Sequence, residues 1–349
     1  MTTLITGGAG FIGSHAALHY ASKGHNVVVL DNLFRGHAAA VEAIRQSLPA
    51  GHRSAIVFEH IDVTDHHEMA AAFVRHRPAR VLHFAARAYV GESVSQPIEC
   101  WHANLTGTAS LLAACKAAGV PKLVFSSTCA TFGEPAPEQI PIRETTPQRP
   151  INPYGASKLA AERLISDFAH AQKIAGVDFA AAFLRYFNVA GADPLGRIGE
   201  DHRPETHLIP IILQCMLGLR PAHNNTLSIF GTDYPTPDGT CIRDYVHVAD
   251  LVDAHVRVLD ALKPGEVRAY NVGSGKGFSV RQVIDAAERV TGRTLNVSLA
   301  PRREGDPATL YADAALITRE LGWSPQFANL EDMIAHAWAW FQTHPNGYG

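Results

Sequence analysis

The chain of 349 residues lacks the features that mark secreted, membrane-spanning or nucleic-acid-binding proteins. Its five cysteines are an odd number, scattered and without a Cys-x-x-Cys pair, which indicates free thiols in a reducing compartment. No stretch approaches the roughly 20 apolar residues that a bilayer requires, and Gly7 and Gly8 interrupt any signal-like apolar segment. We therefore expect a cytoplasmic protein with no membrane partner.

The chain also lacks any run of lysines or arginines, and its formal net charge is −3, so no nucleic-acid partner is expected. Its 19 histidines show no His-Glu-x-x-His or similar ligand spacing, so the sequence predicts no metal site. What the chain does have is length and 46% hydrophobic residues. This is enough to bury the core of one large α/β domain and of a smaller one.

A glycine-rich turn follows the first predicted strand. The strand covers Thr2–Thr6, the next helix runs to about Lys23, and Gly7, Gly10 and Gly13 mark the turn between them. Glycines at this spacing provide a tight turn, allow the backbone to approach a pyrophosphate, and let helix and strand pack closely. The pattern predicts a dinucleotide site, and the alternative is a glycine-rich turn that binds no ligand.

An acidic residue ends the second predicted strand. This strand covers Asn26–Leu30, and Asp31 follows it, eighteen residues after Gly13. A carboxylate at this place accepts hydrogen bonds from both hydroxyls of a ribose and repels a 2′-phosphate, which favours NAD over NADP. Arg35 lies close enough in the sequence to keep NADP open as an alternative.

Strands and helices continue to alternate along the first half of the chain. Further strands are predicted over Ala55–His60, Arg80–Phe84, Lys122–Ser126 and Val177–Arg185, and a helix over Leu105–Ala118. Asp62-Val63, Ala85-Ala86 and Ser127-Thr128 follow three of these strands, at the sheet edge where such folds bind ligands. The fold class predicted is α/β, with a Rossmann-type, doubly wound, mostly parallel sheet in residues 1–188.

The second half is expected to form a smaller, mixed α/β substrate lobe, residues 189–349, with about 240–272 crossing back to the first domain. Between Gly191 and about Tyr234 the chain is rich in Gly, Pro, Asp and Asn, with one clear helix near Ile209–Leu217. The remaining predicted elements are a strand stub and helix in Asp244–Leu262, a strand over Arg268–Val272, a helix over Ser279–Thr291 and a strand over Leu295–Leu299.

The segment from Asn152 to Lys158 predicts a helix start with two reactive groups on one face. Asn152 can cap the helix, and Pro153 can take its first position. Tyr154 and Lys158 are then four residues apart, so an ammonium lies beside a phenol. The positive charge favours phenolate, which lets Tyr154 act as a base near neutral pH. The alternative is an ordinary surface Tyr–Lys pair.

Several motifs together resemble the extended short-chain dehydrogenase/reductase family: the glycine turn, Thr128 at a strand end, and Tyr154-x-x-x-Lys158. Further motifs narrow the resemblance to the UDP-glucose 4-epimerase group of nucleotide-sugar epimerases, over essentially the whole chain. These motifs are Phe84-Ala85-Ala86, Val90-Gly91-Glu92-Ser93, Leu184-Arg185-Tyr186-Phe187-Asn188, Gly239-x-x-x-Arg243-Asp244-Tyr245 and Pro301-Arg302-Arg303-Glu304-Gly305-Asp306.

The resemblance implies NAD-dependent 4-epimerisation of a UDP-sugar through a 4-keto intermediate. Tyr154 would take the proton from the sugar 4-hydroxyl, and Thr128 would hydrogen-bond the same oxygen. Lys158 would hold the nicotinamide ribose and favour the phenolate. NAD would stay tightly bound because each turnover regenerates it. The cofactor-binding residues implied are Gly7, Gly10, Phe11, Ile12, Gly13, Asp31, Asn32, Asp62, Val63, Phe84, Ala85, Ala86, Asn104 and Lys158.

The UDP-sugar is expected to bind mainly to the second half of the chain. Arg243 and Arg303 suit a diphosphate, because guanidinium groups bind phosphate oxygens bidentately, and Phe230 offers an aromatic face to a base. The alternative for each arginine is an ion pair with an acidic neighbour such as Asp244 or Glu304. The substrate-binding residues implied are Thr128, Tyr154, Asn188, His207, Leu208, Phe230, Arg243, Arg303, Asp306 and Leu310.

Two positions depart from the family pattern. Ala88 stands where some members have a lysine that contacts the NAD phosphates, a role that Arg87 or Arg35 would then fill. His207 stands where well-known members have an asparagine, so its contact with the substrate is open.

Leu310 decides which sugar is expected. In the family, the position four residues past the Asp of Arg-Arg-Glu-Gly-Asp lies against the sugar. A tyrosine there goes with plain hexoses, and a small residue such as cysteine admits a 2-acetamido group. Leu310 has intermediate bulk and offers an acetamide no hydrogen bond. It predicts UDP-glucose and UDP-galactose as the main pair, UDP-xylose and UDP-arabinose as the alternative, and UDP-N-acetylglucosamine as a poor substrate.

Other functional classes fit the motifs less well. Nucleotide-sugar dehydratases and decarboxylases need an acid–base carboxylate directly after the catalytic strand end, whereas Cys129-Ala130-Thr131 follows Thr128 here. A non-catalytic NAD-binding regulatory protein would not need Thr128, Tyr154 and Lys158 together. The resemblance also implies a homodimer, through helices near Leu105–Ala118 and Leu159–Ala169 that pack across a two-fold axis.

Overall fold

The computed structural model describes residues 1–303 and 306–349, so Glu304 and Gly305 of the second-half motif lie outside the described residues. The chain forms two compact units, each built from separate segments. Unit 1 contains Met1–Gly133, Pro147–Arg185 and Val252–Tyr270, and unit 2 contains Glu134–Thr146, Tyr186–Leu251 and Asn271–Gly349. None of the described helices is long and apolar enough to cross a membrane.

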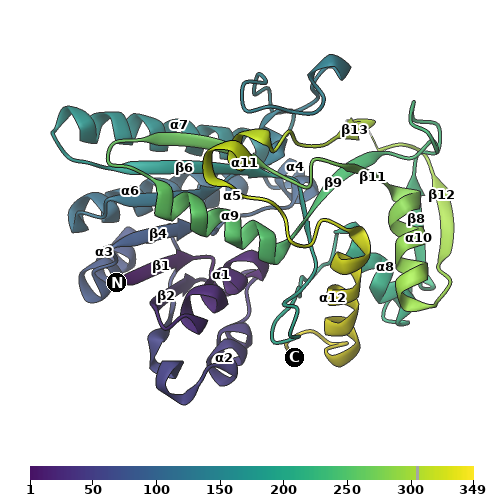
Figure 1. The fold of residues 1–349 in the computed structure, drawn as a ribbon, viewed down its shortest axis with the longest axis horizontal. Coiled ribbons are helices and arrows are strands. Elements are labelled where there is room, and N and C mark those ends of the chain that lie inside the picture. The colour runs from purple at the N-terminus through teal and green to yellow at the C-terminus, as the bar shows by residue number, and fades with distance from the viewer. Residues whose placement is uncertain (304–305) are drawn as a thin grey trace. The chain divides into compact units, whose positions relative to one another are not determined.

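Unit 1 is built on a seven-stranded sheet with the order β10-β6-β5-β4-β1-β2-β3 (Figure 1). Strands β1 to β6 pair in parallel, which confirms the predicted Rossmann-type sheet. The order reverses between β1 and β4, and ligands bind at the carboxyl ends of strands beside such a reversal. The strands are β1 Thr2–Thr6, β2 Asn26–Asp31, β3 Ile56–His60, β4 Arg80–His83, β5 Lys122–Ser126, β6 Ala180–Tyr186 and β10 Val267–Val272.

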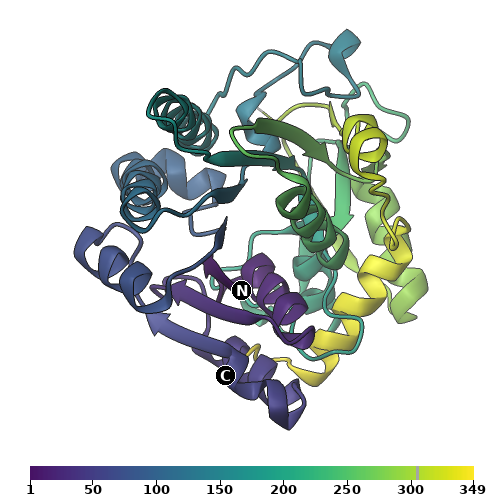
Figure 2. The same ribbon diagram turned by 60° about the vertical axis from the view of Figure 1, so that its left-hand side comes forward.

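Helices cover both faces of this sheet: α3, α6 and α7 lie on one face, and α1, α2 and α9 on the other (Figure 2). Under α3, α6 and α7, Leu4 and Val28 of the sheet belong to one buried core with Phe73, Leu111 and Ile165. Because both faces are covered, the central strands of the sheet are largely buried. The helices are α1 Phe11–Ser22, α2 Ala38–Ser47, α3 His66–His76, α6 Gly107–Ala118, α7 Pro153–Ile174 and α9 Val248–Ala261.

Helix α7 begins as the sequence predicts and ends in a way that shortens the next strand. Asn152 Oδ1 accepts a hydrogen bond from the Gly155 N–H at 2.8 Å, and Pro153 is the first helical residue. At the other end, the Val177 N–H donates to the Gln172 carbonyl at 2.9 Å and closes the last turn. Strand β6 therefore begins three residues later than expected.

The helix predicted from Leu105 becomes α-helical only at Gly107. Residues His102–Thr106 (η2) form a π-helical turn before α6. Such turns often occur at functional sites, and this one contains Asn104. The other short elements of unit 1 are η1 Ala50–Ala55, α4 Val90–Ser95, α5 Pro97–Trp101 and η3 Cys129–Thr131.

Unit 2 combines two small sheets with helices that share one core. Strand β9 lies between β11 and β13 and also pairs with β7, while β8 and β12 form a parallel pair. Helices α8, α10 and α12 pack through buried residues that include Ile212, Val283 and Trp340. Strand β8 falls in the stretch where only one helix was expected. Its partner β12 is far along the chain, so no local pattern marks the pairing.

The strands of unit 2 are β7 Asn188–Ala190, β8 Thr226–Phe230, β9 Ile242–His247, β11 Gly277–Ser279, β12 Asn296–Ala300 and β13 Thr309–Leu310. Its helices are η4 Pro137–Gln139, α8 Leu208–Met216, η5 Pro221–His223, α10 Val280–Thr291, α11 Ala315–Leu321 and α12 Leu330–Thr343. The smaller, mixed α/β part of the predicted fold is therefore confirmed.

Candidate active site

The turn between β1 and α1, together with the start of α1, has no room for side chains at Gly7, Gly8 and Gly13. Gly7 has φ +67°, and a Cβ there would lie 2.5 Å from the backbone nitrogen of Ala85. A Cβ on Gly13 would lie 2.1 Å from the carbonyl oxygen of Gly7. Gly10 precedes α1, whose start has no side-chain cap. Because first-turn amides have no partner within a helix, this backbone forms a cradle that fits a pyrophosphate.

Asp31 is held at the end of β2 by two backbone N–H groups. Its Oδ2 accepts from Ala9 at 3.0 Å and its Oδ1 from Leu33 at 2.8 Å. Burial raises the pKa of the Asp31 carboxyl above its ordinary range, against these two hydrogen bonds, which lower it. A Cβ on Gly36 would lie 2.9 Å from both carboxylate oxygens, so that glycine leaves the carboxylate its space. The carboxylate lies beside the glycine turn, where a dinucleotide ribose is expected.

The two arginines expected to compensate for the lysine missing at Ala88 share one acidic partner. Arg35 Nη2 lies 3.0 Å from Glu92 Oε2, and Arg87 Nη1 lies 3.2 Å from Glu92 Oε1. Both guanidinium groups also lie over the Phe34 ring, 4.5 and 4.4 Å from its centre. Glu92 balances only one of these two positive charges, so the pair together suits an anionic phosphate.

Asn104 ties the loop after β4 to helix α7. Its Oδ1 accepts from the Arg87 backbone N–H at 2.8 Å, and its Nδ2 donates to the Arg87 carbonyl at 3.1 Å and to Ser157 Oγ at 2.9 Å. The structure also brings two other predicted residues together, since Asn32 Nδ2 donates to Asp62 Oδ2 at 2.7 Å. The remaining predicted cofactor residues lie at element ends: Phe11 and Ile12 at the start of α1, Val63 after β3, and Phe84, Ala85 and Ala86 after β4.

Thr128 and Tyr154 lie on two segments that approach each other closely, the turn after β5 and the start of α7. A Cβ on Gly155 would lie 2.3 Å from the carbonyl oxygen of Ala130, so a glycine is needed for this approach. Thr128 Oγ1 accepts from the Ala130 N–H at 3.1 Å, and the Tyr154 N–H donates to Ser93 Oγ at 3.1 Å. Thr128 and Tyr154 are both buried, on backbone that these contacts fix.

Lys158 lies one helical turn after Tyr154 and is only 3% exposed. Its Nζ donates to the Ser126 carbonyl at 2.8 Å and lies 4.6 Å from the centre of the Phe125 ring. Burial lowers the pKa of Lys158 to about 7, although Cys100 and Glu162 act to raise it. An adjacent anion, such as a phenolate, favours the ammonium form, so Lys158 and a deprotonated tyrosine would stabilise each other.

Sequence reasoning missed a buried ion pair behind these groups. Arg185 Nε and Nη2 donate to Glu162 at 3.0 and 2.6 Å, and Ser127 Oγ donates to the same carboxylate. The cluster joins the ends of β5 and β6 to α7: Ser127 precedes Thr128 in the chain, and Glu162 follows Lys158 by one helical turn. The only sequence signal was Arg185 in the motif that ends β6, because its partner Glu162 is fixed by the tertiary fold.

In unit 2, the predicted substrate residues form two contact groups. Arg243 forms an ion pair with Asp306, and Leu310 is the register partner of Arg243 in the parallel pairing of β13 with β9. Separately, the guanidinium carbon of Arg303 lies 3.9 Å from the centre of the Phe230 ring. The structure thus brings Arg243, Asp306 and Leu310 together, and Phe230 together with Arg303.

Asp244, the residue next to Arg243, was considered as its ion-pair partner, but its carboxylate accepts hydrogen bonds from other residues. Asp244 accepts hydrogen bonds from the Ser274 N–H and hydroxyl at 2.8 and 2.7 Å, and from the Ala312 N–H at 3.0 Å. Asp244 is thus bonded to Ser274 and Ala312, and the acidic partner of Arg243 in the structure is Asp306. Asn188 Nδ2 donates to the Asp244 carbonyl at 3.1 Å. For Arg303, the corresponding neighbour Glu304 lies outside the described residues.

His207 occupies the N-cap position of α8 without a side-chain capping hydrogen bond, and Leu208 is the first residue of the helix. His207 also belongs to a group with Glu200, His202 and Glu205, whose metal-ligand atoms all lie within 4.8 Å of one another. The sequence predicted no metal site because the spacing Glu-x-His-x-x-Glu-x-His is not one of the motifs considered. The available signal was the density of ligand-type side chains in residues 200–207.

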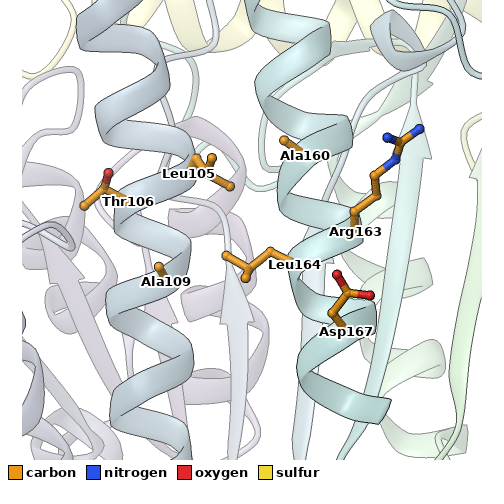
Figure 3. Close-up of a pocket in the computed structure, with 7 residues that line it drawn as sticks. All are labelled: Leu105, Thr106, Ala109, Ala160, Arg163, Leu164 and Asp167. Carbon is orange, nitrogen blue, oxygen red and sulfur yellow. The ribbon is translucent and has the colours of Figure 1, made fainter. Parts of the chain in front are cut away.

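An open groove of about 500 Å³ lies between α6 and α7 (Figure 3). The side chains of Leu105 and Leu164 point from one helix towards the other. The groove is lined by Leu105, Thr106, Ala109, Ala160, Arg163, Leu164 and Asp167. None of these is a predicted catalytic, cofactor or substrate residue, so the groove is not the active site.

Comparison with known proteins gives the family. The model of the NAD dependent epimerase/dehydratase family matches residues 3–273. The chain is 48% identical to a UDP-glucose 4-epimerase of Halalkalibacterium halodurans, over 100% of this chain and 98% of the relative. It is 44% identical to a probable UDP-arabinose 4-epimerase 3 of Oryza sativa subsp. japonica, over 99% of this chain and 83% of the relative.

A solved structure agrees with these relatives. The fold is similar to that of a UDP-glucose 4-epimerase from Stenotrophomonas maltophila with bound NAD and formylated UDP-arabinopyranose. The TM-score is 0.89 and the identity 40%, over 99% of both chains. Sequence and fold therefore agree over the full length, and the chain belongs to the NAD-dependent epimerase/dehydratase family.

Proposed function

We propose that this protein interconverts UDP-glucose and UDP-galactose by NAD-dependent 4-epimerisation through a 4-keto sugar. The observation that carries the proposal is the close approach of the Tyr154–Lys158 helix start to the Thr128 turn, through Gly155. It occurs in a chain that is 48% identical over its whole length to a UDP-glucose 4-epimerase. A base can take the hydroxyl proton when a sugar alcohol is oxidised, while a second hydroxyl can orient that oxygen and an ammonium can stabilise the deprotonated base.

NAD is the cofactor, and the residues of unit 1 fit it. The cradle at Gly7 and Gly13, which any Cβ would fill, suits the pyrophosphate. Asp31 suits the adenosine ribose, and the surplus positive charge of Arg35 and Arg87 suits the phosphates. Held by these residues, NAD would supply the acceptor and donor of a hydride at C4 of the sugar.

The chain's own residues move the proton. Tyr154, as phenolate, takes the proton of the 4-hydroxyl and gives it back when the keto group is reduced. Thr128 hydrogen-bonds the same oxygen and holds it in line with Tyr154. Lys158, whose Nζ lies at the end of β5, holds the nicotinamide ribose and stabilises the phenolate as ammonium. Because Tyr154 ends each cycle in its starting form, no outside acid or base is consumed.

The UDP-sugar is held by residues of unit 2. Arg243 and Arg303 bind the diphosphate, and Phe230, already stacked with Arg303, offers its ring to the uracil. Asp306, the present partner of Arg243, fixes that guanidinium until the phosphate arrives. Asn188, His207, Leu208 and Leu310 complete the set, with Leu310 against the sugar.

A second candidate substrate pair is UDP-xylose and UDP-arabinose. The 44% identity to a probable UDP-arabinose 4-epimerase is close to the 48% identity to a UDP-glucose 4-epimerase, which supports both pairs. Leu310 also permits a pentose, because removal of the C6 hydroxymethyl group leaves more room. The same catalytic residues serve either pair.

The test is an assay without added cofactor. Purified protein is expected to convert UDP-glucose to UDP-galactose, detected by chromatography, and to release NAD on denaturation. A panel of UDP-hexoses, UDP-pentoses and UDP-N-acetylhexosamines ranks the substrates by kcat/KM. Failure to convert any of them would contradict the proposal, and a higher value for the pentose pair would favour the second candidate. Recovery of NADP would show that Arg35 outweighs Asp31.

We further propose that the protein is a cytoplasmic homodimer in which the groove between α6 and α7 receives the same helices of a second copy. Small side chains at Ala109 and Ala160 allow helices to approach closely, and Leu105 and Leu164 supply apolar contact. The cytoplasmic location is supported by the five free cysteines.

Light scattering during gel filtration tests the dimer. We expect about twice the chain mass of 37.7 kDa. Leu164→Arg should shift the protein towards the monomer, because it places a charge in the apolar contact. Ile174→Arg, at an exposed apolar site at the end of the same helix, is the matched control and should stay dimeric. A monomeric wild-type protein would contradict the proposal.

A further inference from the structure

A segment of unit 2 between β7 and α8 gathers four side chains that are typical metal ligands. Glu200, His202, Glu205 and His207 each offer one ligand atom, and these atoms lie within 4.8 Å of one another. The proposed reaction uses only His207 among them, as a substrate contact. It gives no reason for the other three to converge on one point.

The separations within the cluster are close to those in a tetrahedral metal site. Glu200 Oε1 lies 2.9 Å from His202 Nδ1 and 3.1 Å from His207 Nδ1. Glu205 Oε1 lies 2.9 Å from His207 Nδ1, and its Oε2 lies 3.6 Å from His202 Nδ1. Ligands bound to Zn²⁺ at about 2.0–2.2 Å in a tetrahedron are about 3.3–3.6 Å apart. Because the four ligand atoms all lie within 4.8 Å of one another, side-chain shifts of up to about 1 Å would seat a cation among them.

The cluster is buried and rich in negative charge. Glu200 and Glu205 are 3% and 7% exposed, and two carboxylates in such surroundings require compensating positive charge. Glu205 Oε2 is buried and, within the part of the chain that the structure describes, receives no hydrogen bond. The His207 side chain is 40% exposed, which gives a cation a path from solvent to the carboxylates.

Contacts around the cluster hold its members in place. The N–H groups of Thr206 and His207 both donate to Glu205 Oε1, at 2.7 and 2.8 Å, and fix that carboxylate. The Glu200 carbonyl accepts from Trp340 Nε1 at 3.3 Å, so the first ligand is anchored to α12. Ligands oriented by such outer contacts lose little conformational freedom when a metal binds.

We propose that Glu200, His202, Glu205 and His207 bind one divalent transition-metal cation of the Zn²⁺ type. Two imidazoles and two carboxylates match the ligand preferences of Zn²⁺ and its tetrahedral geometry, whereas Mg²⁺ and Ca²⁺ prefer oxygen ligands alone. A divalent cation also balances the two buried carboxylates. The rival arrangement is a metal-free cluster in which two protonated histidines supply the same two positive charges.

A site with four protein ligands is closed, so its role is structural. It fixes the segment that leads into α8, where His207 and Leu208 are expected to meet the UDP-sugar. The proposal does not depend on the epimerase activity, because the site takes no part in the proton or hydride transfer.

The test measures metal binding by the whole protein. Wild-type protein is treated with EDTA, exchanged into metal-free buffer and titrated with ZnCl2 in competition with a chromophoric chelator, while Co²⁺ loading is followed by visible absorption. The variants are His202→Gln and Glu205→Gln, with folding checked by circular dichroism. The control is His66→Gln/His67→Gln, which removes two adjacent exposed histidines that could bind Zn²⁺ adventitiously.

We expect the wild type and the control to bind about one Zn²⁺ per chain, and the His202 and Glu205 variants to bind it at least ~10-fold more weakly. Co²⁺-loaded wild type should show the intense visible bands of tetrahedral coordination. No stoichiometric Zn²⁺ binding by the wild type would overturn the proposal, as would equal affinity in the folded variants or loss of binding in the control. If either variant fails to fold, the Co²⁺ spectrum of the wild type still decides between a tetrahedral site and none.

Discussion

Units 1 and 2 hold their functional side chains by different means. In unit 1, Asp31 and Lys158 are buried at strand or helix ends and bonded to backbone groups. In unit 2, Arg243 pairs with the Asp306 side chain and also donates to the Ile242 carbonyl at 2.7 Å, and Arg303 lies over the Phe230 ring. Backbone partners fix a geometry, which suits the chemical step, whereas side-chain partners can exchange for a ligand. Substitutions in unit 1 should therefore act on kcat, and those in unit 2 on KM and substrate choice.

The largest effect is expected at Tyr154. Tyr154→Phe removes the base but keeps the ring, so kcat should fall at least ~10²-fold while bound NAD is retained. Steady-state kinetics and the nucleotide released on denaturation measure both quantities. Tyr20→Phe is the matched control, because the Tyr20 hydroxyl is buried without a hydrogen-bond partner among the described residues. Near-normal turnover in Tyr154→Phe would rule out its role as the base.

Thr128 comes next. Thr128→Ala should lower kcat about tenfold to a hundredfold, because a hydrogen bond to the reacting oxygen is lost. Thr128→Ser keeps the hydroxyl, including its bond to the Ala130 N–H, and should be mild. If the two variants were equally slow, the effect would come from packing of the methyl group and not from the hydroxyl.

Burial of Lys158 in unit 1 should make the free energy of unfolding depend on pH. Its pKa falls from 10.5 to about 7 on folding, so between these values the unfolded chain binds the extra proton. Stability of nucleotide-free wild type should therefore rise with pH across this window, by at most about 1.4 kcal/mol per pH unit, and level off below pH 7. Lys158→Met lacks this slope. Urea unfolding of both proteins from pH 6 to 10 measures the difference, and parallel profiles would contradict the burial argument.

Local features could be predicted from the sequence, whereas contacts between distant segments could not, for a physical reason. The glycine turn, the Asn152 cap and the Tyr154–Lys158 spacing are local signals, so the start of α7 could be predicted residue by residue. The Glu92 pairs with Arg35 and Arg87, the Glu162–Arg185 pair and the Glu200–His207 cluster could not. Their partners are set by how loops and distant strands fold back. The β8–β12 pairing was missed for the same reason.

In unit 2, Arg303→Ala should raise KM for UDP-glucose about tenfold with a smaller change in kcat. A charge-assisted hydrogen bond to phosphate contributes roughly 1.5–3 kcal/mol and is present in both ground and transition states. Arg302→Ala is the matched control, because Arg302 bonds to Asp233 instead. A loss confined to kcat would group Arg303 with the catalytic residues of unit 1. It would contradict the expectation that substitutions in unit 2 act on KM.

The smallest effect is expected at Leu310. Leu310→Cys and Leu310→Ala should improve kcat/KM for UDP-N-acetylglucosamine relative to UDP-glucose by a few-fold, because the shorter side chain leaves room for the acetamide. The ratio is measured in mixed-substrate assays. An unchanged ratio, or wild-type protein that already prefers the N-acetyl sugar, would show that Leu310 is not the size gate.

The most direct test of the account follows a deuterium atom at C4 of UDP-glucose. In the proposed reaction this atom leaves the sugar as hydride and returns to the same sugar, while only the hydroxyl proton passes through Tyr154. We predict that UDP-galactose formed in ordinary water without added NAD keeps nearly all of the label at C4, as read by mass spectrometry. Loss of the label to solvent would contradict hydride transfer through a retained cofactor, and with it the proposed reaction.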